Sequence, residues 1–345
     1  MRKLSSLNAA ALAALLLASA TASADEVAEF YKGKTLTIVV GHQTGTGYDL
    51  YARTLARYFG RHIPGNPQVL VQNMNGASGL AALNWLANKA PKDGTAIATM
   101  VFTAPFEPLF GAGKGKFDAT KFLWVGNLDS SVAVCGASRK SGVTSFKDLF
   151  DGKTLLVGGT GQTGPFRTVP TALKNLLEIP GLKVVSGYKG SMSVKLAIQT
   201  GELGGACGPT MSTVRANFAD LWKAGDFKII VQAGVKPHPD PALKDVPHIY
   251  SFARSDETKK IFDMIFGMQS LGRPYMGPAG IPDARGKALQ KAFMDTARDP
   301  AFVAEAKKAN LELDPEAGPE VAALVARIYG TPKPLADKAR AAMAK

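Results

Sequence analysis

Short apolar runs, each followed by a helix-like segment, recur along this chain. The first three are TLTIVV at 35–40, VLVQNM at 69–74 and TAIATMVF at 95–102. They are continuously apolar rather than alternating, which is typical of strands buried on both faces of a largely parallel sheet. Since helix-like segments separate these runs, the pattern predicts an α/β architecture in which helices cover the sheet.

The pattern starts again after residue 121, which indicates a second unit of the same kind. Strand-like segments lie at 122–128, 131–137, 153–159, 182–188 and 227–234, and the chain beyond residue 255 is mainly helical.

We therefore predict two lobes around a cleft, each a mostly parallel sheet flanked by helices. Residues 25–126 and 232–345 are assigned to lobe 1, and residues 127–231 to lobe 2. Strands that cross between the lobes near 125–130, and at 205–210 or 228–234, would act as the hinge.

The N-terminus has the three parts of a signal peptide. Arg2 and Lys3 precede an apolar stretch of about twelve residues, and Ala22-Ser23-Ala24 supplies the small residues that signal peptidase needs. A spanning helix needs about 20 apolar residues, so this stretch is too short to be a good anchor. We expect cleavage before Asp25 and a periplasmic protein.

Composition excludes several classes of protein. The 345 residues are 46% hydrophobic, which excludes a disordered chain, and the net charge of +13 is spread without a basic block, which disfavours nucleic-acid binding. Two cysteines exclude a multi-cysteine metal cage. Cys135 and Cys207 form either a disulfide or two buried thiols.

The first strand runs into the glycine-rich turn Gly41–Asp49 and then into a helix. Glycines allow a backbone to approach a ligand closely, and a helix N-terminus attracts a carboxylate or phosphate. The turn is therefore either an anion site or a plain strand–helix connection. Asp49 most simply stabilises the first helical turn.

A second turn, Gly158–Pro165, has the same context. Residues 159–164 match G-x-G-x-x-G, but the next strand ends in Ser186-Gly187-Tyr188 without the acidic residue that binds a ribose. This disfavours a nucleotide site. Each lobe thus contributes a Gly/Thr-rich turn at a helix start, and the two together predict a clamp for an anion.

An exported hydrolase that uses Asp49 or Ser78 is the rival hypothesis. Ser78 is not in a G-x-S-x-G elbow, because Leu80 stands where the second glycine is required. No Ser-His-Asp context and no H-E-x-x-H motif occurs. We therefore expect no catalysis, no cofactor and no metal.

Five segments in order resemble the substrate-binding receptors of tripartite tricarboxylate transporters, the Bug-type periplasmic proteins. They are FYKGKTLTIVVG, the loop Gly47-Tyr48-Asp49-Leu50-Tyr51-Ala52-Arg53, QNMNGASGLAALNWLANKAPKDGTAIATM, residues 186–203 and residues 276–302. The resemblance implies a two-lobed Venus flytrap of type II-like topology that closes on a small carboxylate. It also implies delivery of this ligand to membrane permease subunits. We expect a monomer, and a receptor that feeds a sensor kinase instead of a permease is a further alternative.

The resemblance places the ligand loops at 43–49 and 160–166, with the Tyr188-Lys189-Gly190-Ser191 turn beside the cleft. Two departures stand out: Tyr48 replaces a small hydroxyl residue, and Val246-Pro247-His248 replaces a Val-Pro-Thr stretch. They allow a bulkier or aromatic carboxylate. The predicted ligand-binding set is Gln43, Thr44, Thr46, Gly47, Tyr48, Asp49, Ser78, Phe102, Thr160, Gly161, Gln162, Thr163, Gly164, Phe166, Tyr188 and Cys207.

Overall fold

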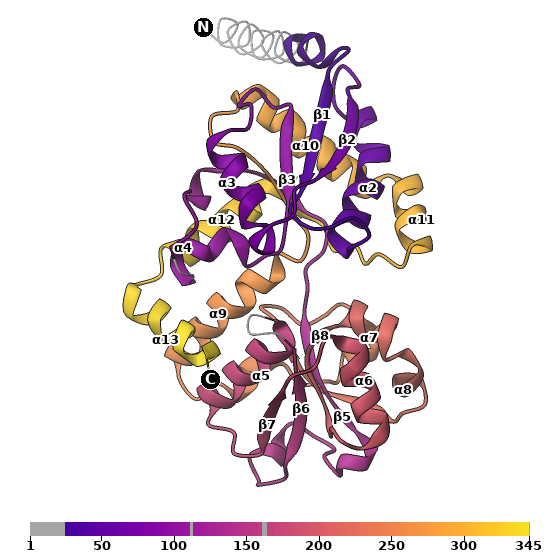
Figure 1. The fold of residues 1–345 in the computed structure, drawn as a ribbon, viewed down its shortest axis with the longest axis vertical. Coiled ribbons are helices and arrows are strands. Elements are labelled where there is room, and N and C mark those ends of the chain that lie inside the picture. The colour runs from indigo at the N-terminus through magenta and orange to yellow at the C-terminus, as the bar shows by residue number, and fades with distance from the viewer. Residues whose placement is uncertain (1–24, 111–112, 161–163, 345) are drawn as a thin grey trace, which may run out of the picture.

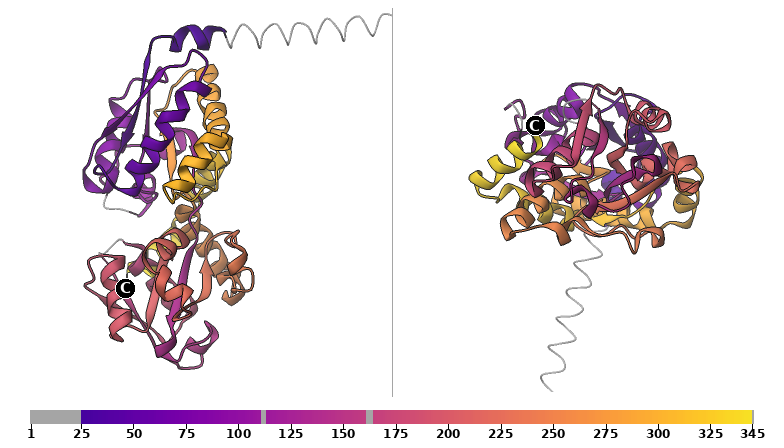
Figure 2. Two further views of the ribbon diagram at one scale, coloured as in Figure 1. Left: turned by 90° about the vertical axis from the view of Figure 1, so that its right-hand side faces the viewer. Right: turned by 90° about the horizontal axis from the view of Figure 1, so that it is seen from below.

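The computed structural model describes residues 25–110, 113–160 and 164–344; the predicted signal peptide lies outside them. Within these ranges the strands form two mixed sheets, one in each of two lobes (Figure 1). Figure 2 shows the lobes stacked along the long axis of the molecule. None of the helices described combines the length and apolar character needed to cross a membrane. The predicted two-lobed α/β fold is confirmed.

The upper sheet in Figure 1 has the order β11-β4-β10-β3-β1-β2 among the described residues. β1 is parallel to β2 and β3, whereas β10 is antiparallel to β3 and β4, so only half of this sheet follows the predicted parallel arrangement. The strands are β1 (Thr35–Val40), β2 (Gln68–Asn73), β3 (Ala96–Thr99), β4 (Leu123–Asn127), β10 (Pro274–Gly277) and β11 (Glu316–Ala317).

The lower sheet has the order β7-β6-β8-β5-β9 among the described residues. β6 is parallel to β7 and β8, and β5 is antiparallel to β8 and β9, so this sheet is mixed as well. The strands are β5 (Ala133–Ser138), β6 (Leu155–Gly159), β7 (Leu182–Ser186), β8 (Gly205–Thr210) and β9 (Phe227–Ala233).

Helices cover both faces of each sheet (Figure 1). The upper lobe has α2 (Gly47–Phe59), α3 (Leu80–Asn88), α4 (Glu107–Phe110), α10 (Asp283–Arg298), α11 (Pro300–Lys308) and α12 (Gly318–Tyr329). The lower lobe has α5 (Pro165–Leu177), α6 (Ser191–Thr200), α7 (Met211–Asn217) and α8 (Ala219–Lys223). Two further helices pack on the lower lobe from the C-terminal part of the chain: α9 (Asp256–Ser270) and α13 (Lys333–Ala344).

Strand β1 shows why its sequence is continuously apolar. Ile38 and Val40 pack against α2 and α10 on one face, while Val39 packs against α3 and α12 on the other. Burying each such side chain contributes about 1.5–3 kcal/mol. β2 differs, because it is an edge strand: Leu70 is 57% exposed, so the expectation that this run is buried on both faces is wrong.

The lobes are joined where the chain passes from β4 to β5 through residues 128–132, and again along α9. The buried amide of Asn127 ties these two connections together. Its Nδ2 donates to the carbonyl oxygens of Asp129 (2.9 Å) and Ser270 (3.0 Å), and its Oδ1 accepts from the backbone N–H of Arg273 (2.9 Å). A longer bond from Nδ2 reaches Glu316 Oε2 (3.4 Å). A buried amide bonded in this way at both its nitrogen and its oxygen fixes the relative position of the crossing segments.

The predicted boundary at 231 needs correction, because much of the chain beyond it packs on the lower sheet. Ile249, Phe262 and Ala339 share the core of β5, β6 and α5, so 232–345 is not a single lobe-1 segment. The expected hinge strands 205–210 and 228–234 lie within the lower sheet as β8 and β9. The chain beyond residue 255 is mainly helical, as predicted, but helical periodicity does not say which sheet a helix covers.

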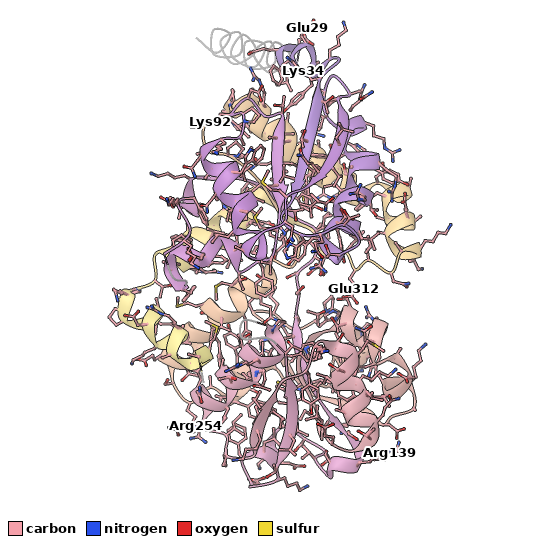
Figure 3. The ribbon with its side chains drawn as sticks, in the orientation of Figure 1. Glu29, Lys34, Lys92, Arg139, Arg254 and Glu312 are labelled. Carbon is pink, nitrogen blue, oxygen red and sulfur yellow. A yellow bond between two sulfur atoms is a disulfide. The ribbon has the colours of Figure 1, made fainter. Side chains whose placement is uncertain are left out.

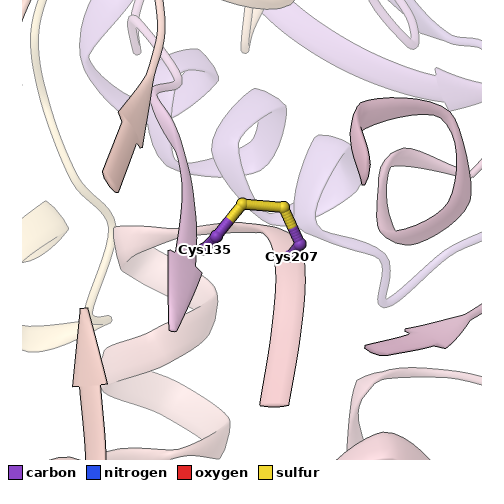
Figure 4. Close-up of a disulfide and its surroundings, with 2 residues drawn as sticks. All are labelled: Cys135 and Cys207. Atoms are coloured by element: carbon purple, nitrogen blue, oxygen red, sulfur yellow. A yellow bond between two sulfur atoms is a disulfide. The ribbon is translucent and has the colours of Figure 1, made fainter. Parts of the chain in front are cut away.

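A disulfide joins Cys135 of β5 to Cys207 of β8 (Figure 4). The two residues face each other in register across neighbouring antiparallel strands, with Cα atoms 3.9 Å apart. Of the two arrangements left open by the sequence, the structure has the disulfide. Since both cysteines are fully buried, the bond is part of the lower-lobe core.

We expect reduction of this disulfide to destabilise the protein. The bond closes a loop with a sequence separation of 72 residues. Loop closure of this length is worth about 4 kcal/mol in the chain-entropy description. Urea unfolding of the exported form with and without reductant should show a lower midpoint when reduced. The Cys135→Ala/Cys207→Ala variant should be insensitive to reductant; equal wild-type midpoints would contradict the expectation.

Candidate functional site

The first predicted turn connects β1 to α2 at the edge of the upper lobe. Gly45 has φ +82°, a conformation that favours glycine. Thr46 is the N-cap of α2: its hydroxyl donates to the Gln43 carbonyl (2.9 Å) and accepts from the Asp49 N–H (3.5 Å). The turn is thus shaped locally, and Gly47 begins the helix at an exposed position.

Asp49 shapes the turn rather than facing a ligand. Its carboxylate is 2% exposed and accepts from the Gly45 N–H (2.8 Å), Arg53 Nε (3.0 Å) and Asn73 Nδ2 (2.9 Å). Burial acts to raise the pKa of Asp49, but these hydrogen bonds, that from Arg53 first, bring it below its usual value. Both oxygens of this carboxylate already accept hydrogen bonds within the protein, which does not fit the prediction that Asp49 contacts the ligand.

Asn73 connects the turn to the end of β2. Its Nδ2 also donates to the His42 carbonyl (3.0 Å), and its Oδ1 accepts from Arg53 Nη2 (2.9 Å) and from the Thr44 hydroxyl (3.2 Å). Gln43 and Thr44 are exposed. The network of Asp49, Arg53 and Asn73 therefore holds the turn in place and leaves its outer side open.

Arg273, which the sequence analysis missed, lies beside this turn. Its guanidinium carbon is 4.7 Å from the ring centroids of both Tyr48 and Tyr51. Its Nη2 would lie 3.2 Å from a Cβ placed on Gly47, which locates the charge at the first residue of α2. The Nε is buried and has no hydrogen-bond partner among the described residues. A positive charge with a free donor thus stands next to a helix N-terminus.

No local signal in the sequence marks Arg273. It precedes β10, and β10 pairs with β3 and β4 in antiparallel fashion, which carries the side chain to a turn more than two hundred residues earlier. Arg53 lies on the same lobe but is committed to Asp49. Tertiary structure alone decides that Arg53 is paired with a carboxylate while Arg273 keeps an Nε without a partner among the described residues.

Tyr48 and His42 form an aromatic wall at the same place. Their rings stack with centroids 4.7 Å apart and an interplanar angle of 20°. Burial, with a contribution from Arg273, lowers the pKa of His42, so the imidazole is neutral at pH 7. Burial raises the pKa of Tyr48, although Arg273 opposes the effect. Tyr48 therefore supplies an uncharged aromatic surface, as its departure from the family pattern suggested.

The second predicted turn leads from β6 into α5 of the lower lobe. Gly164 is the N-cap and offers no side-chain cap, and Pro165 at the first helical position needs no partner for a backbone N–H. Thr160 is half-buried at the end of β6. The predicted residues Gly161, Gln162 and Thr163 lie outside the described residues.

Three other predicted ligand residues of the lower lobe are occupied elsewhere. Phe166 is 7% exposed and packs in the core. The Tyr188 hydroxyl donates to Glu202 (2.6 Å), and burial with this carboxylate raises the pKa of Tyr188 to about 12. Cys207 is fully buried in the disulfide with Cys135, so its sulfur cannot contact a ligand. The prediction of these side chains as direct contacts does not fit their positions.

The lobes approach each other around α5. A cavity of about 400 Å³ is lined by Ala77 and Phe102 of the upper lobe together with Pro165 and Thr168 at the start of α5. The N-terminus of α5 therefore faces the upper lobe. Ser78 is in the same 3-10 turn as Ala77, and its side chain is outside what the structure describes.

A larger interlobe cavity of about 830 Å³ suits an anion poorly. Its lining carries more acidic than basic groups, namely Asp129, Asp240, Glu312 and Asp314 against Arg215 and Lys307, with His238. Glu312 lies at the lower edge of the upper lobe (Figure 3) and forms an ion pair with Arg215 of α7 across the gap. Because an acidic lining repels an anion, we take the two turns, and not this cavity, as the candidate anion site.

Asp129, between β4 and β5, is a buried acid of the hinge. It is 4% exposed, accepts from the Ser131 hydroxyl (3.2 Å), and burial raises its pKa to about 6 although Arg273 opposes the effect. A raised carboxyl pKa in the folded state means that the folded chain binds the proton more tightly than the unfolded chain. Stability is therefore lost as pH rises from about 4 through 6.

We predict that Asp129→Asn removes part of this pH dependence. The variant should be more stable than wild type by about 2–3 kcal/mol at pH 7.5, because the wild-type shift from 3.8 to about 6 costs that much. At pH 4 the two should be nearly equal. Urea unfolding at both pH values checks this; a variant destabilised at pH 7.5 would show that the carboxylate stabilises the hinge.

Comparison with models of protein families finds no match, and no significantly similar curated protein is found. Solved structures do match. A TctC solute-binding protein from Polaromonas without ligand is 18% identical, with 89% of this chain and 99% of that chain covered and a TM-score of 0.69. The periplasmic binding protein BugD is 19% identical (91% and 99% covered, TM-score 0.59).

MatC from Rhodopseudomonas palustris with bound malate is also 19% identical (89% and 99% covered, TM-score 0.57). The likeness spans almost the whole of each solved chain and includes both lobes. The chain therefore has the two-lobed fold of the periplasmic solute-binding proteins TctC and BugD, as the sequence resemblance predicted.

Proposed function

We propose that this chain is a periplasmic receptor that captures a small organic carboxylate between its lobes and delivers it to a tripartite tricarboxylate-type permease. The observation that carries the proposal is the half-buried Arg273 side chain, whose Nε has no partner among the described residues and whose Nη2 stands beside the first residue of α2. A carboxylate beside this guanidinium would compensate its positive charge, and the Nε is a donor that no other described group uses.

The electrostatics favour an anion over a neutral solute. A helix N-terminus carries about half a positive charge, and charge-assisted hydrogen bonds are about twice as strong as neutral ones. In the upper lobe the partial charge of α2 and the full charge of Arg273 act together. In the lower lobe α5, a helix of 13 residues without a side-chain cap, faces the upper lobe. An anion between them is attracted from both sides.

The fold supports the same class of function. The structurally similar MatC holds malate, and TctC is a solute-binding protein. A signal peptide predicted at residues 1–24 agrees with a receptor in the periplasm. We propose binding without turnover, and the engagement of the Asp49 carboxylate by Gly45, Arg53 and Asn73 supports this for the one acid that the rival hydrolase hypothesis would use. The ligand should be recovered chemically unchanged after incubation.

We predict that Arg273→Gln weakens carboxylate binding by about 10–100-fold, since a charge-assisted hydrogen bond contributes about 1.5–3 kcal/mol. Isothermal titration of residues 25–345 against a panel of aliphatic and aromatic carboxylates, malate included, measures this. Arg273→Lys should bind with intermediate affinity, because it keeps the charge and loses the planar fork.

Arg285→Gln is the matched control. Arg285 also stacks on an aromatic ring, that of Phe30 at 3.6 Å, and donates to the Asp93 carbonyl, but it lies away from the turn. This variant should bind like wild type. Equal affinities of the Arg273→Gln and Arg285→Gln variants would show that Arg273 does not bind the ligand. If wild type binds none of the carboxylates in the panel, the proposed receptor function is wrong.

We also predict that the two lobes close when the ligand binds. A ligand held from both lobes should draw them together about the segments at 128–132 and α9. Small-angle scattering of wild type should then give a smaller radius of gyration with a saturating carboxylate than without. The Arg273→Gln variant at the same ligand concentration serves as the control. Identical curves for saturated and free wild type would show that closure does not accompany binding.

Delivery to a permease is tested in cells. Deleting the gene should abolish uptake of the labelled carboxylate at concentrations near its dissociation constant, and the wild-type gene should restore it. If uptake is unaffected while transcription no longer responds to the carboxylate, the receptor serves a sensor kinase and not a transporter.

A further inference from the structure

A cavity lies between the lobes at the start of α5. It has a volume of about 400 Å³, within the range of about 300–1,000 Å³ that is typical of small-molecule pockets. Its walls come from the upper lobe, from α5 and from two helices that pack on the lower lobe, α9 and α13. Pro165 is the first residue of α5 and also lines the cavity, so the cavity is adjacent to the N-terminus of this helix.

The walls of this cavity are mainly apolar. Aromatic and aliphatic side chains from all four sources face it, including Phe102, Phe106, Val169, Ile265, Met268 and Met343. Most of these side chains also belong to, or pack against, the cores of the two lobes. An apolar group that enters gains from burial at about 25 cal/mol per Å² of apolar surface.

Each of the two charged side chains among the described lining residues already has hydrogen-bond partners. The Glu107 carboxylate accepts from the backbone N–H groups of Lys114 (2.9 Å) and Gly115. The Arg340 guanidinium donates to Asp337 on its own helix. A second carboxylate at the far end of a ligand would therefore meet no free cation among the described lining residues, and its desolvation would be uncompensated.

Among the described lining residues, Gln269 carries a polar group that points to a ligand. It is 3% exposed, belongs to α9 and lines the cavity, and its Nε2 has no hydrogen-bond partner among the described residues. A buried donor without a partner costs about 1–3 kcal/mol. An acceptor atom on a bound molecule removes this cost.

We propose that the cavity receives the uncharged, largely apolar tail of a monocarboxylate, an aryl or compact alkyl group that carries one hydrogen-bond acceptor for Gln269 Nε2. This assignment rests on the proposed function, because it needs the carboxylate of the same molecule at the start of α5. It narrows the substrate from any small organic acid to acids with one charged end. A molecule with two ionised ends, such as malate, is a weaker ligand.

Isothermal titration of wild-type residues 25–345 with matched probes tests the tail. The probes are 4-acetylbenzoate, which has an acceptor, 4-isopropylbenzoate, which has the same shape without one, terephthalate, which is charged at both ends, and acetate, which has no tail. The 3-phenylpropanoates with the same substituents are also tested, because their longer chain carries the ring further from the carboxylate into the cavity. We expect the acetyl compound to bind at least about tenfold more tightly than terephthalate and acetate, and more tightly than its isopropyl counterpart.

Gln269→Met tests the hydrogen bond, since it keeps a similar volume and removes the donor. The ratio of acetyl to isopropyl affinity should fall to about one, with the isopropyl affinity unchanged. Gln68→Met, on an exposed position of the edge strand β2, is the control and should keep the wild-type ratio. The wild-type probe series decides the proposal by itself if the Gln269 variant does not fold.

The outcomes separate this inference from the proposed function. Tighter binding of terephthalate or malate than of the uncharged-tail acids, or an unchanged acetyl-to-isopropyl ratio in a folded Gln269→Met variant, overturns the tail pocket and leaves the receptor in place. Failure of every carboxylate, short and long, to bind overturns both.

Discussion

A single buried side chain amide organises the centre of this molecule. Asn127 is fully buried and bonds to the crossing segment through Asp129, to the end of α9 through Ser270 and to the backbone of Arg273. Asp129 lies two residues from Asn127, whereas Ser270 and Arg273 belong to one segment more than 140 residues further along the chain. One buried amide therefore connects the interlobe segment, the C-terminal end of α9 and the backbone of Arg273. Its hydrogen bonds are strong because they lie in a low-dielectric environment.

The placement of Arg273 explains how a receptor can select an anion while presenting few charged groups to it. Tyr48 and Tyr51 hold the guanidinium by stacking, and only part of its hydrogen-bonding capacity is used within the chain. Asp49 and Arg53 neutralise each other nearby, so they shape the turn without competing for the ligand. A preorganised cation of this kind loses little conformational entropy when an anion binds.

Local features of the fold were predictable from the sequence, and long-range ones were not. The strands, the first Gly/Thr-rich turn and the starts of α2 and α5 follow from apolar runs and glycine spacing, and the structure has them. The sheet partners of the C-terminal helices, the antiparallel strand β10 and the exposure of Leu70 depend on contacts across the chain, which periodicity does not encode.

The candidate site shows the same limit. Gly47 and Tyr48 were found because they lie in the turn itself, whereas Arg273 and Gln269 enter from distant elements. Asp49 lies in the first turn of α2, as the sequence analysis expected, but its bond to Asn73 on another strand could not be predicted from the turn alone. Phe166 and Cys207 lie beside the correct elements, but their side chains point into the core.

The central claim is that the interlobe site recognises the negative charge of a carboxylate. The most direct measurement compares, by isothermal titration at neutral pH, the tightest-binding carboxylate with its own primary amide, which has nearly the same shape and no charge. The account predicts that the amide binds at least about 100-fold more weakly, as expected when charge-assisted hydrogen bonds are lost. Equal affinity for the two compounds would contradict it.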